Sequence, residues 1–193
     1  MIFNHAFRCA TLIALSLFLI GCPSKPVDET PVMEQKPLVV FLVRHAEKVD
    51  AGKDPELSKE GKKRTEDLAE ILRSANIDHV HSTDYIRTRD TATPLAKANG
   101  VEVEKYNPDD LDGFAEDLKK AGGRHLVVGH SNTTPKLTKL LGGDAGAAID
   151  EKSEYDRIYV VTVAKDGTAS SVLMRFGEAF KEKEPEKKEE VEG

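Results

Sequence analysis

The chain has 193 residues, of which 39% are hydrophobic and 32% are charged. This length and composition fit one globular domain with a core of its own, rather than two domains. The formal net charge is −6 at pH 7. Nucleic acids and anionic membrane surfaces are therefore poor partners for this chain.

The N-terminal segment differs in composition from the rest. Arg8 precedes an apolar run from Cys9 to Ile20, which is short for a membrane span but suits the hydrophobic region of a secretory signal. The run ends in LIGC, which resembles the lipobox of bacterial lipoproteins. That resemblance implies that residues 1–21 are a lipoprotein signal peptide and that the thiol of Cys22 is diacylated after cleavage. An ordinary cleaved signal and a short membrane anchor are the alternatives.

Lipidation at Cys22 would anchor the chain, through palmitate or similar acyl groups, in the cell envelope, facing the periplasm or the exterior. Two or three acyl chains anchor a protein stably, whereas one chain binds only marginally. Loss of residues 1–21 removes Arg8 and no acidic residue, so the mature net charge would be −7. Because Cys9 would leave with the signal, no thiol would remain for a disulfide or for thiolate chemistry.

Two segments of biased composition flank the central part of the chain. Residues 22–37 contain four prolines and are typical of an extended tether. Residues 178–193 are mostly charged and too poor in apolar side chains to bury a core, which predicts a disordered tail or a frayed helix. We therefore expect a single folded domain over residues 38–177.

Apolar runs and helical spacing alternate through this domain. The valine-rich run from Leu38 to Val43 predicts a strand buried on both faces of a parallel sheet, and Ser58 is placed to cap a helix. The later elements are predicted in this order: a helix with Leu68, Ile71, Leu72 and Ala75, a strand near 79–83, a helix with Leu95, a strand at 101–106, a short helix with Phe114 and Leu118, a strand at 126–128, a helix with Leu137, Leu140 and Leu141, and a hairpin of 157–164 and 169–176. The pattern predicts an α/β fold, a three-layer α/β/α sandwich with a mostly parallel sheet.

Charged motifs follow several of these strands. The motif RHAEK places Arg44 and His45 at the end of the first strand, and GHSN places His130 at the end of a later one. Between them, RTRDTA carries Arg87 into a helix. Ligands of open α/β sheets bind outside the carboxyl ends of the strands, and arginine and histidine suit phosphate oxygens. The sequence therefore predicts a phosphate-handling site.

The motifs RHAEK, RTRDTA and GHSN, in this order, resemble those of the histidine phosphatase superfamily, also called the phosphoglycerate mutase-like family, over roughly residues 38–176. The resemblance implies a phosphoglycerate mutase-like fold and a phosphatase that works through a phosphohistidine intermediate. It assigns His45 as the nucleophile and Arg44, Arg87 and His130 as the residues that hold the phosphoryl group. We expect these four residues to be catalytic.

Other polar residues carry weaker expectations. Glu47 resembles the acidic residue that follows the Arg-His pair in many members, and it either contacts the substrate or is a solvated carboxylate. Asn132 either reaches a phosphate oxygen or caps a helix. Family mutases supply a glutamate as proton donor and family acid phosphatases an aspartate after the second histidine, where this chain has Ser131. We expect Asp109 or Asp110 to be the donor, with helix capping as the competing role of Asp110.

His79 and His81 alternate on a strand and share a face, but no third ligand is evident nearby, so we expect no metal and no cofactor. The expected substrate is a phosphorylated small molecule or a phosphoprotein. A phosphoglycerate mutase-type phosphotransferase is the enzymatic alternative, disfavoured because its donor is not evident and its substrates lie across the membrane. A non-catalytic phosphate-binding module is the other alternative.

Overall fold

A computed structural model of the chain describes residues 36–50 and 52–181. The predicted signal peptide, Cys22, most of the tether and residues 182–193 lie outside the described residues. The elements are β1 (Leu38–Arg44), α1 (Lys59–Leu72), β2 (His79–Ser82), α2 (Ile86–Asn99), β3 (Val103–Lys105), α3 (Leu111–Ala121), β4 (Gly123–Gly129), α4 (Thr133–Leu140), β5 (Arg157–Val163) and β6 (Ala169–Arg175). Their order is the one predicted from the sequence, although β3 is shorter and β4 longer than expected.

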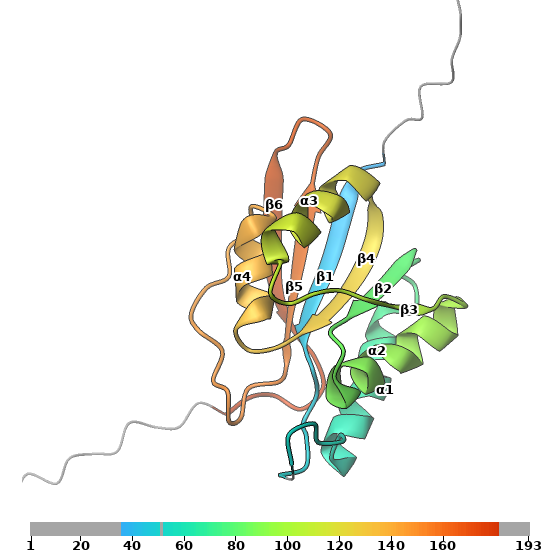
Figure 1. Cartoon of the computed structure of the whole chain (residues 1–193), viewed down its shortest axis with the longest axis vertical. Helices are drawn as coiled ribbons and strands as arrows, with labels where there is room; N and C mark the ends of the chain where they lie inside the picture. Colours follow the sequence, from blue (N-terminus) through green and yellow to red (C-terminus); the bar gives the residue numbers. More distant parts are fainter. Residues whose placement is uncertain (1–35, 51, 182–193) are drawn as a thin grey trace, which may run out of the picture. The chain divides into compact units, whose positions relative to one another are not determined.

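The strands form one six-stranded sheet in the order β3-β2-β4-β1-β5-β6 (Figure 1). The pairs β2–β3, β2–β4 and β1–β4 are parallel, whereas β5 runs antiparallel to β1, and β6 antiparallel to β5. The predicted mostly parallel sheet is thus confirmed, and the predicted hairpin forms one of its edges. The carboxyl ends of β1 to β4 consequently lie along the same end of the sheet.

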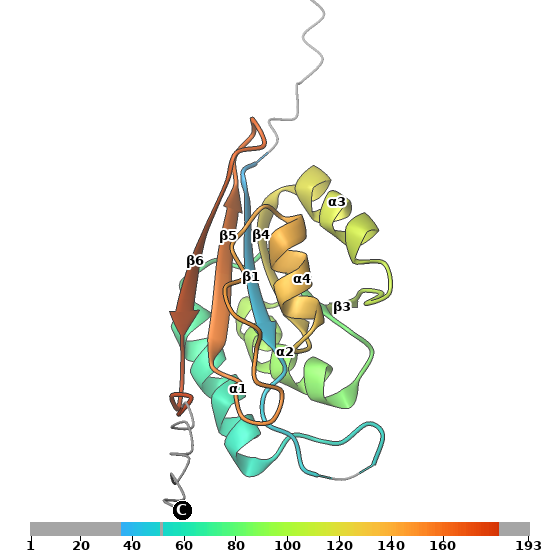
Figure 2. The ribbon, with the colours of Figure 1, turned by 90° about the vertical axis from the view of Figure 1, so that its left-hand side faces the viewer.

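Helices cover both faces of the sheet, which gives three layers (Figure 2). On one face Leu38, Val40 and Leu42 of β1 pack in a core cluster with residues of α3 and α4. On the other face Val43 belongs to a second cluster with residues of α1 and α2. This alternation follows from the pleat of a strand, whose successive side chains point to opposite faces.

Local capping fixes where two helices begin. The Ser58 hydroxyl accepts a hydrogen bond from the backbone N–H of Gly61 at 3.1 Å, as its position in the sequence predicted. At the start of α3, Asp110 accepts from the N–H of Gly113 at 3.0 Å. Such caps satisfy backbone donors that a helix leaves unpaired, and each stabilises a helix by about 1 kcal/mol.

The C-terminal border of the domain is set by polar contacts with α1 and with Asp156, the residue before β5. Arg64 of α1 donates to the carbonyl of Phe176 at 2.8 Å and to that of Glu178 at 3.0 Å. The N–H of Phe180 donates to the carboxylate of Asp156 at 2.9 Å. Contacts with the domain thus continue past residue 177, where the sequence suggested its end. Across the two stretches that the structure describes, no helix is both long and apolar enough to cross a membrane.

Candidate active site

Two neighbouring strands deliver a histidine each to the same end of the sheet. Arg44, the last residue of β1, lies opposite Gly129, the last residue of β4. The N–H of His45 then donates to the carbonyl of Gly129 at 2.9 Å, and His130 follows directly. The rings of His45 and His130 lie edge to face, with centroids 5.5 Å apart.

These histidines line a cavity of about 470 Å³. Residues from the ends of all four parallel strands contribute to its wall, among them Arg44, His45, Arg87, Asp109, His130 and Asn132. The structure thus brings together the four residues expected to be catalytic, although they come from segments far apart in the sequence. Their common position follows from the parallel order of β1 to β4.

A backbone hydrogen bond selects the tautomer of His45. Nδ1 of His45 lies 2.8 Å from the carbonyl of Ala46. Because a carbonyl can only accept, Nδ1 carries the proton, and the neutral ring keeps its lone pair on Nε2. Burial, together with the positive charges of Arg44 and Arg87, lowers the pKa of His45 to about 3. At neutral pH the imidazole is therefore neutral, with the lone pair of Nε2 unprotonated.

His130 is also neutral in the unliganded protein. Burial, followed by the charges of Arg87 and Arg44, lowers its pKa to about 4. Its Nε2 lies 3.0 Å from the hydroxyl of Thr83, and its ring packs edge to face against Tyr85 with centroids 5.1 Å apart. A bound phosphoryl dianion would raise this pKa, because opposite charge favours the imidazolium.

Arg44 is fixed by the segment between α4 and β5. Its Nη1 donates to the carbonyls of Asp150 and Glu154 at 3.0 and 2.9 Å, and its Nη2 to that of Glu151 at 2.6 Å. Its Cζ lies 4.0 Å from the ring centroid of Tyr155. Arg44 is 3% exposed, so the guanidinium is held in one orientation.

Arg87 approaches the cavity from the first turn of α2. Its Nη1 lies 3.5 Å from the carboxylate of Asp54, which also accepts from the N–H of Ile86 at 2.9 Å. Its Cζ lies 4.4 Å from the centroid of the Tyr85 ring. The side chain is thus supported on one side by a carboxylate and on another by an aromatic face.

Two donors at this site are left without partners inside the protein. In residues 36–50 and 52–181, the buried side-chain nitrogen and oxygen atoms that make no hydrogen bond are Nε of Arg44 and Nε of Arg87. A buried unpaired donor costs about 1–3 kcal/mol, so such groups call for an explanation. Both atoms belong to side chains that line the cavity of His45 and His130.

Two of the predicted site residues lie elsewhere. Glu47 does not line this cavity; its carboxylate pairs with Arg64, with Oε1 2.7 Å from Nη2 and 2.9 Å from Nε. Asp110 caps α3 and lines a different cavity. Of the two expected proton donors, Asp109 is therefore the one that lines the cavity of His45 and His130.

Asn132 was expected either to contact a ligand or to cap a helix, and its position has features of both. It stands at the N-cap of α4, but its side chain makes no capping hydrogen bond. The Thr133 hydroxyl accepts from the N–H of His130, a residue that precedes the helix, at 2.9 Å. Asn132 lines the cavity and is exposed, so its amide is available to a ligand.

Thr83, Tyr85 and Tyr155 contact residues of the site but were not singled out in the sequence. Thr83 and Tyr85 lie in the segment between β2 and α2, where their closeness to Arg87 in the chain was a signal. Tyr155 lies 111 residues after Arg44 in the chain and carried no local signal. No metal centre accompanies these residues: among the described residues, no group of three or more histidine, cysteine, aspartate or glutamate side chains is arranged to hold a metal ion.

Residues 40–108 match the histidine phosphatase superfamily, branch 1. The match covers 69 of the 193 residues. It includes Arg44, His45 and Arg87. It ends before β4, so His130 lies outside the matched residues and is brought to the site by the pairing of β4 with β1. No curated protein sequence matches the chain.

Solved structures share this fold over most of the chain. The protein histidine phosphatase SixA, complexed with tungstate, has a TM-score of 0.59 at 18% identity, covering 72% of this chain and 97% of that one. A mycobacterial glucosyl-3-phosphoglycerate phosphatase has 0.52 at 14%, covering 72% and 98%. A phosphoglycerate mutase from Bacillus anthracis has 0.52 at 15%, covering 73% and 93%. At these identities the likeness concerns the fold, and it confirms the predicted phosphoglycerate mutase-like architecture.

Proposed function

We propose that this protein is a phosphatase that hydrolyses phosphomonoesters or phosphorylated side chains through a phosphohistidine on His45. One observation carries the proposal: the side chains of Arg44 and Arg87 line the same cavity as the neutral His45. The superfamily of residues 40–108 contains phosphatases, which agrees with this chemistry. The site thus combines a nucleophile with fixed positive charge for the oxygens of a phosphoryl group.

In the first step Nε2 of His45 attacks phosphorus, a P–N bond forms, and the bond from phosphorus to the leaving oxygen breaks. Arg44, Arg87 and His130 stabilise the charge on the three remaining oxygens. The leaving oxygen takes a proton from Asp109, which lines the cavity. The products of this step are the free alcohol and phosphohistidine.

In the second step water attacks the phosphorus, the P–N bond breaks, and inorganic phosphate leaves. Asp109, now a carboxylate, accepts the proton of the water, which reverses its role in the first step. His45 returns to the neutral tautomer in which Nδ1 donates to Ala46. No residue outside the cavity is needed for the cycle.

Phosphorylated small molecules and phosphoproteins are both proposed substrates. One structural neighbour is a protein histidine phosphatase and another a glucosyl-3-phosphoglycerate phosphatase, so a substrate screen should contain a phosphohistidine peptide beside simple esters. The first experiment compares phosphate release from p-nitrophenyl phosphate and from such a peptide by the full chain and by His45→Ala. Loss of phosphate release in His45→Ala supports the proposed phosphatase activity. If the full chain binds phosphate but releases none from any substrate, the binding-module alternative replaces it.

We further propose that Cys22 is lipidated and holds the protein in the cell envelope, since the LIGC sequence resembles a lipobox. Expression of the full chain and of Cys22→Ser in a bacterial host, followed by membrane fractionation and mass spectrometry of the N-terminal peptide, tests this. A diacylglyceryl group on Cys22 and release of the variant from the membrane are expected. An unmodified Cys22 would reject lipidation.

A further inference from the structure

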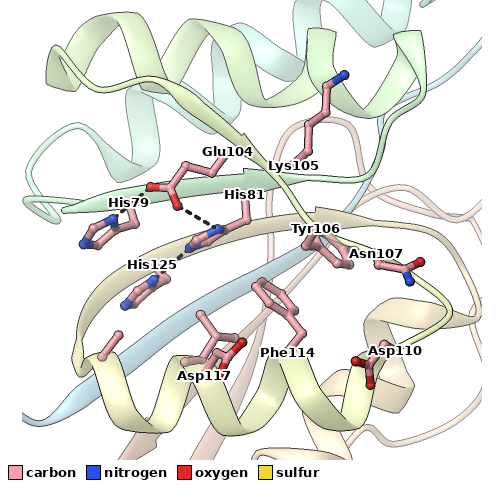
Figure 3. A pocket seen from close by; sticks show the side chains of 12 residues that line it. His79, His81, Glu104, Lys105, Tyr106, Asn107, Asp110, Phe114, Asp117 and His125 are labelled. Carbon is pink, nitrogen blue, oxygen red and sulfur yellow. Dashed lines mark hydrogen bonds and ion pairs between the residues drawn. The ribbon is translucent and has the colours of Figure 1, made fainter.

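A second cavity, of about 430 Å³, lies beside the active site. Figure 3 shows its wall, formed by side chains of β2, β3, β4 and α3. The segment between β3 and α3 separates the two cavities, because Asn107 and Asp110 line this one whereas Pro108 and Asp109 line the active site. All described histidines other than His45 and His130, namely His79, His81 and His125, line the second cavity.

The second cavity has the opposite charge to the active site. Glu104, Asp110 and Asp117 line it, and the one cationic side chain in its wall, Lys105, is paired with Asp84 at 2.9 Å. Aromatic surface completes the wall: the ring of Phe114 lies edge to face with that of His81, with centroids 5.3 Å apart. Phosphate is therefore a poor ligand here.

A chain of hydrogen bonds fixes the tautomers of two of its histidines. Nε2 of His125 lies 2.8 Å from the carbonyl of Gly122, so this nitrogen carries a proton. Nδ1 of neutral His125 is then an acceptor. It accepts a hydrogen bond from the Nε2–H of His81, and the two nitrogens lie 2.9 Å apart. Consequently neutral His81 has a lone pair, and no proton, on Nδ1.

That lone pair faces a carboxylate. Nδ1 of His81 lies 3.7 Å from Oε2 of Glu104, too far for a hydrogen bond. Burial lowers the pKa of His81 to about 4, although Glu104 acts to raise it. At neutral pH two acceptors therefore oppose each other at the cavity wall, and the His81 side chain is only 9% exposed. The other oxygen of Glu104 accepts from Nδ1 of His79 at 2.9 Å.

We propose that this cavity binds an organic cation with N–H donors, a guanidinium or primary ammonium group, between Glu104 and His81. Such a cation places one N–H on Oε2 of Glu104 and another on Nδ1 of His81, which satisfies both acceptors. Its positive charge is complementary to the carboxylates of the wall, and the nearby ring of Phe114 suits a guanidinium plane. A metal ion fits less well, because no three of the described histidine and acidic side chains are arranged to hold one.

To test this, the full chain is labelled with ¹⁵N and held in detergent micelles at pH 7. It is titrated with methylguanidinium and, separately, with agmatine. The expected result is a saturable shift of the ring nitrogens of His81, with the signals of His45 and His130 unchanged. Glu104→Gln should weaken binding at least about tenfold, since it removes a charged acceptor. Glu104 is half exposed, so this variant keeps the fold.

Glu102→Gln is the matched control, because Glu102 is exposed on the same segment and does not line the cavity; it should bind as the unaltered chain does. Absence of a saturable His81 shift would overturn the proposal. So would equal affinity in Glu104→Gln, or binding of Zn²⁺ by a protein that ignores both organic cations. These readouts do not depend on phosphatase activity, so the cation site can be rejected without rejecting the proposed phosphatase function, and the reverse also holds.

Discussion

The hydroxyl of Thr83 lies 3.0 Å from Nε2 of His130, at the end of a chain of hydroxyl groups. The Thr88 hydroxyl has backbone carbonyls of Thr83 and Tyr85 as acceptors, each at 2.9 Å. Its oxygen therefore accepts from the Thr83 hydroxyl, also at 2.9 Å. Having donated its only proton, Thr83 accepts from Nε2–H of His130. This relationship leaves Nδ1 of His130 for a ligand in the cavity.

Replacing Thr83 with valine should release the ring of His130. We expect kcat/KM to fall about tenfold, the loss that one hydrogen bond to a charged group explains, and Thr83→Ser to retain activity. Side-chain ¹⁵N spectra should show the Nε2–H tautomer of His130 in the unaltered chain and a mixture in Thr83→Val. An Nδ1–H tautomer in the unaltered chain would contradict this role.

Arg87→Lys should lower kcat for phosphate release by about 10²–10³, because lysine keeps the charge but loses the fixed fork of donors. The melting temperature should change little, since the hydrogen bond of Arg87 to Asp54 is long, at 3.5 Å, and lysine keeps a cation near the Tyr85 ring. Arg44→Lys differs: it should lower both kcat and stability, because Arg44 holds three backbone carbonyls. Steady-state kinetics and thermal melts of both variants separate the two effects.

Asp109→Asn and Asp110→Ala test the assignment of the proton donor. Asp109→Asn should slow hydrolysis of alkyl phosphates, whose leaving oxygen needs a proton, far more than that of p-nitrophenyl phosphate. Asp110→Ala should leave kcat unchanged and lower the free energy of unfolding by about 1 kcal/mol through loss of the cap on α3. The reverse pattern would transfer the donor role to Asp110.

The protein should lose stability in acid. The pKa of His45 is lowered to about 3, and those of His81 and His130 to about 4, from 6.5. Between pH 6.5 and 4 the unfolded chain therefore binds more protons than the folded one, and the free energy of unfolding falls as the pH falls. Each such histidine adds a slope of up to about 1.4 kcal/mol per pH unit.

Urea unfolding at a series of pH values from 7.5 downward measures this slope. His130→Asn should reduce it, because this variant removes one of the buried histidines with a lowered pKa. A free energy of unfolding that stays constant over this range, or rises in acid, would show that the buried histidines are protonated in the folded protein.

The strands and the four expected catalytic residues were accessible from sequence because their signals are local. The valine-rich run before Arg44 and the apolar run before His130 each predict a buried strand, and the end of a parallel strand is a place for ligands. Pairing of β1 with β4 then brings His45 and His130 together. Local pattern and topology agree here.

The remaining site residues depend on contacts between distant segments. Glu47 was expected near the substrate, but α1 places Arg64 beside it, and an ion pair forms instead. The choice between Asp109 and Asp110 depends on which of them caps α3. Tyr155 reaches Arg44 only after the chain has passed through every parallel strand. Spacing along the sequence does not encode such contacts.

The most direct test of the phosphatase account is to trap the intermediate. The full chain is mixed with a ³²P-labelled substrate and quenched in alkali within milliseconds to seconds, and the labelled peptide is identified by mass spectrometry. We predict an acid-labile phosphoryl group on Nε2 of His45, absent from His45→Ala. Turnover without a labelled protein, or a label on another residue, would contradict the account.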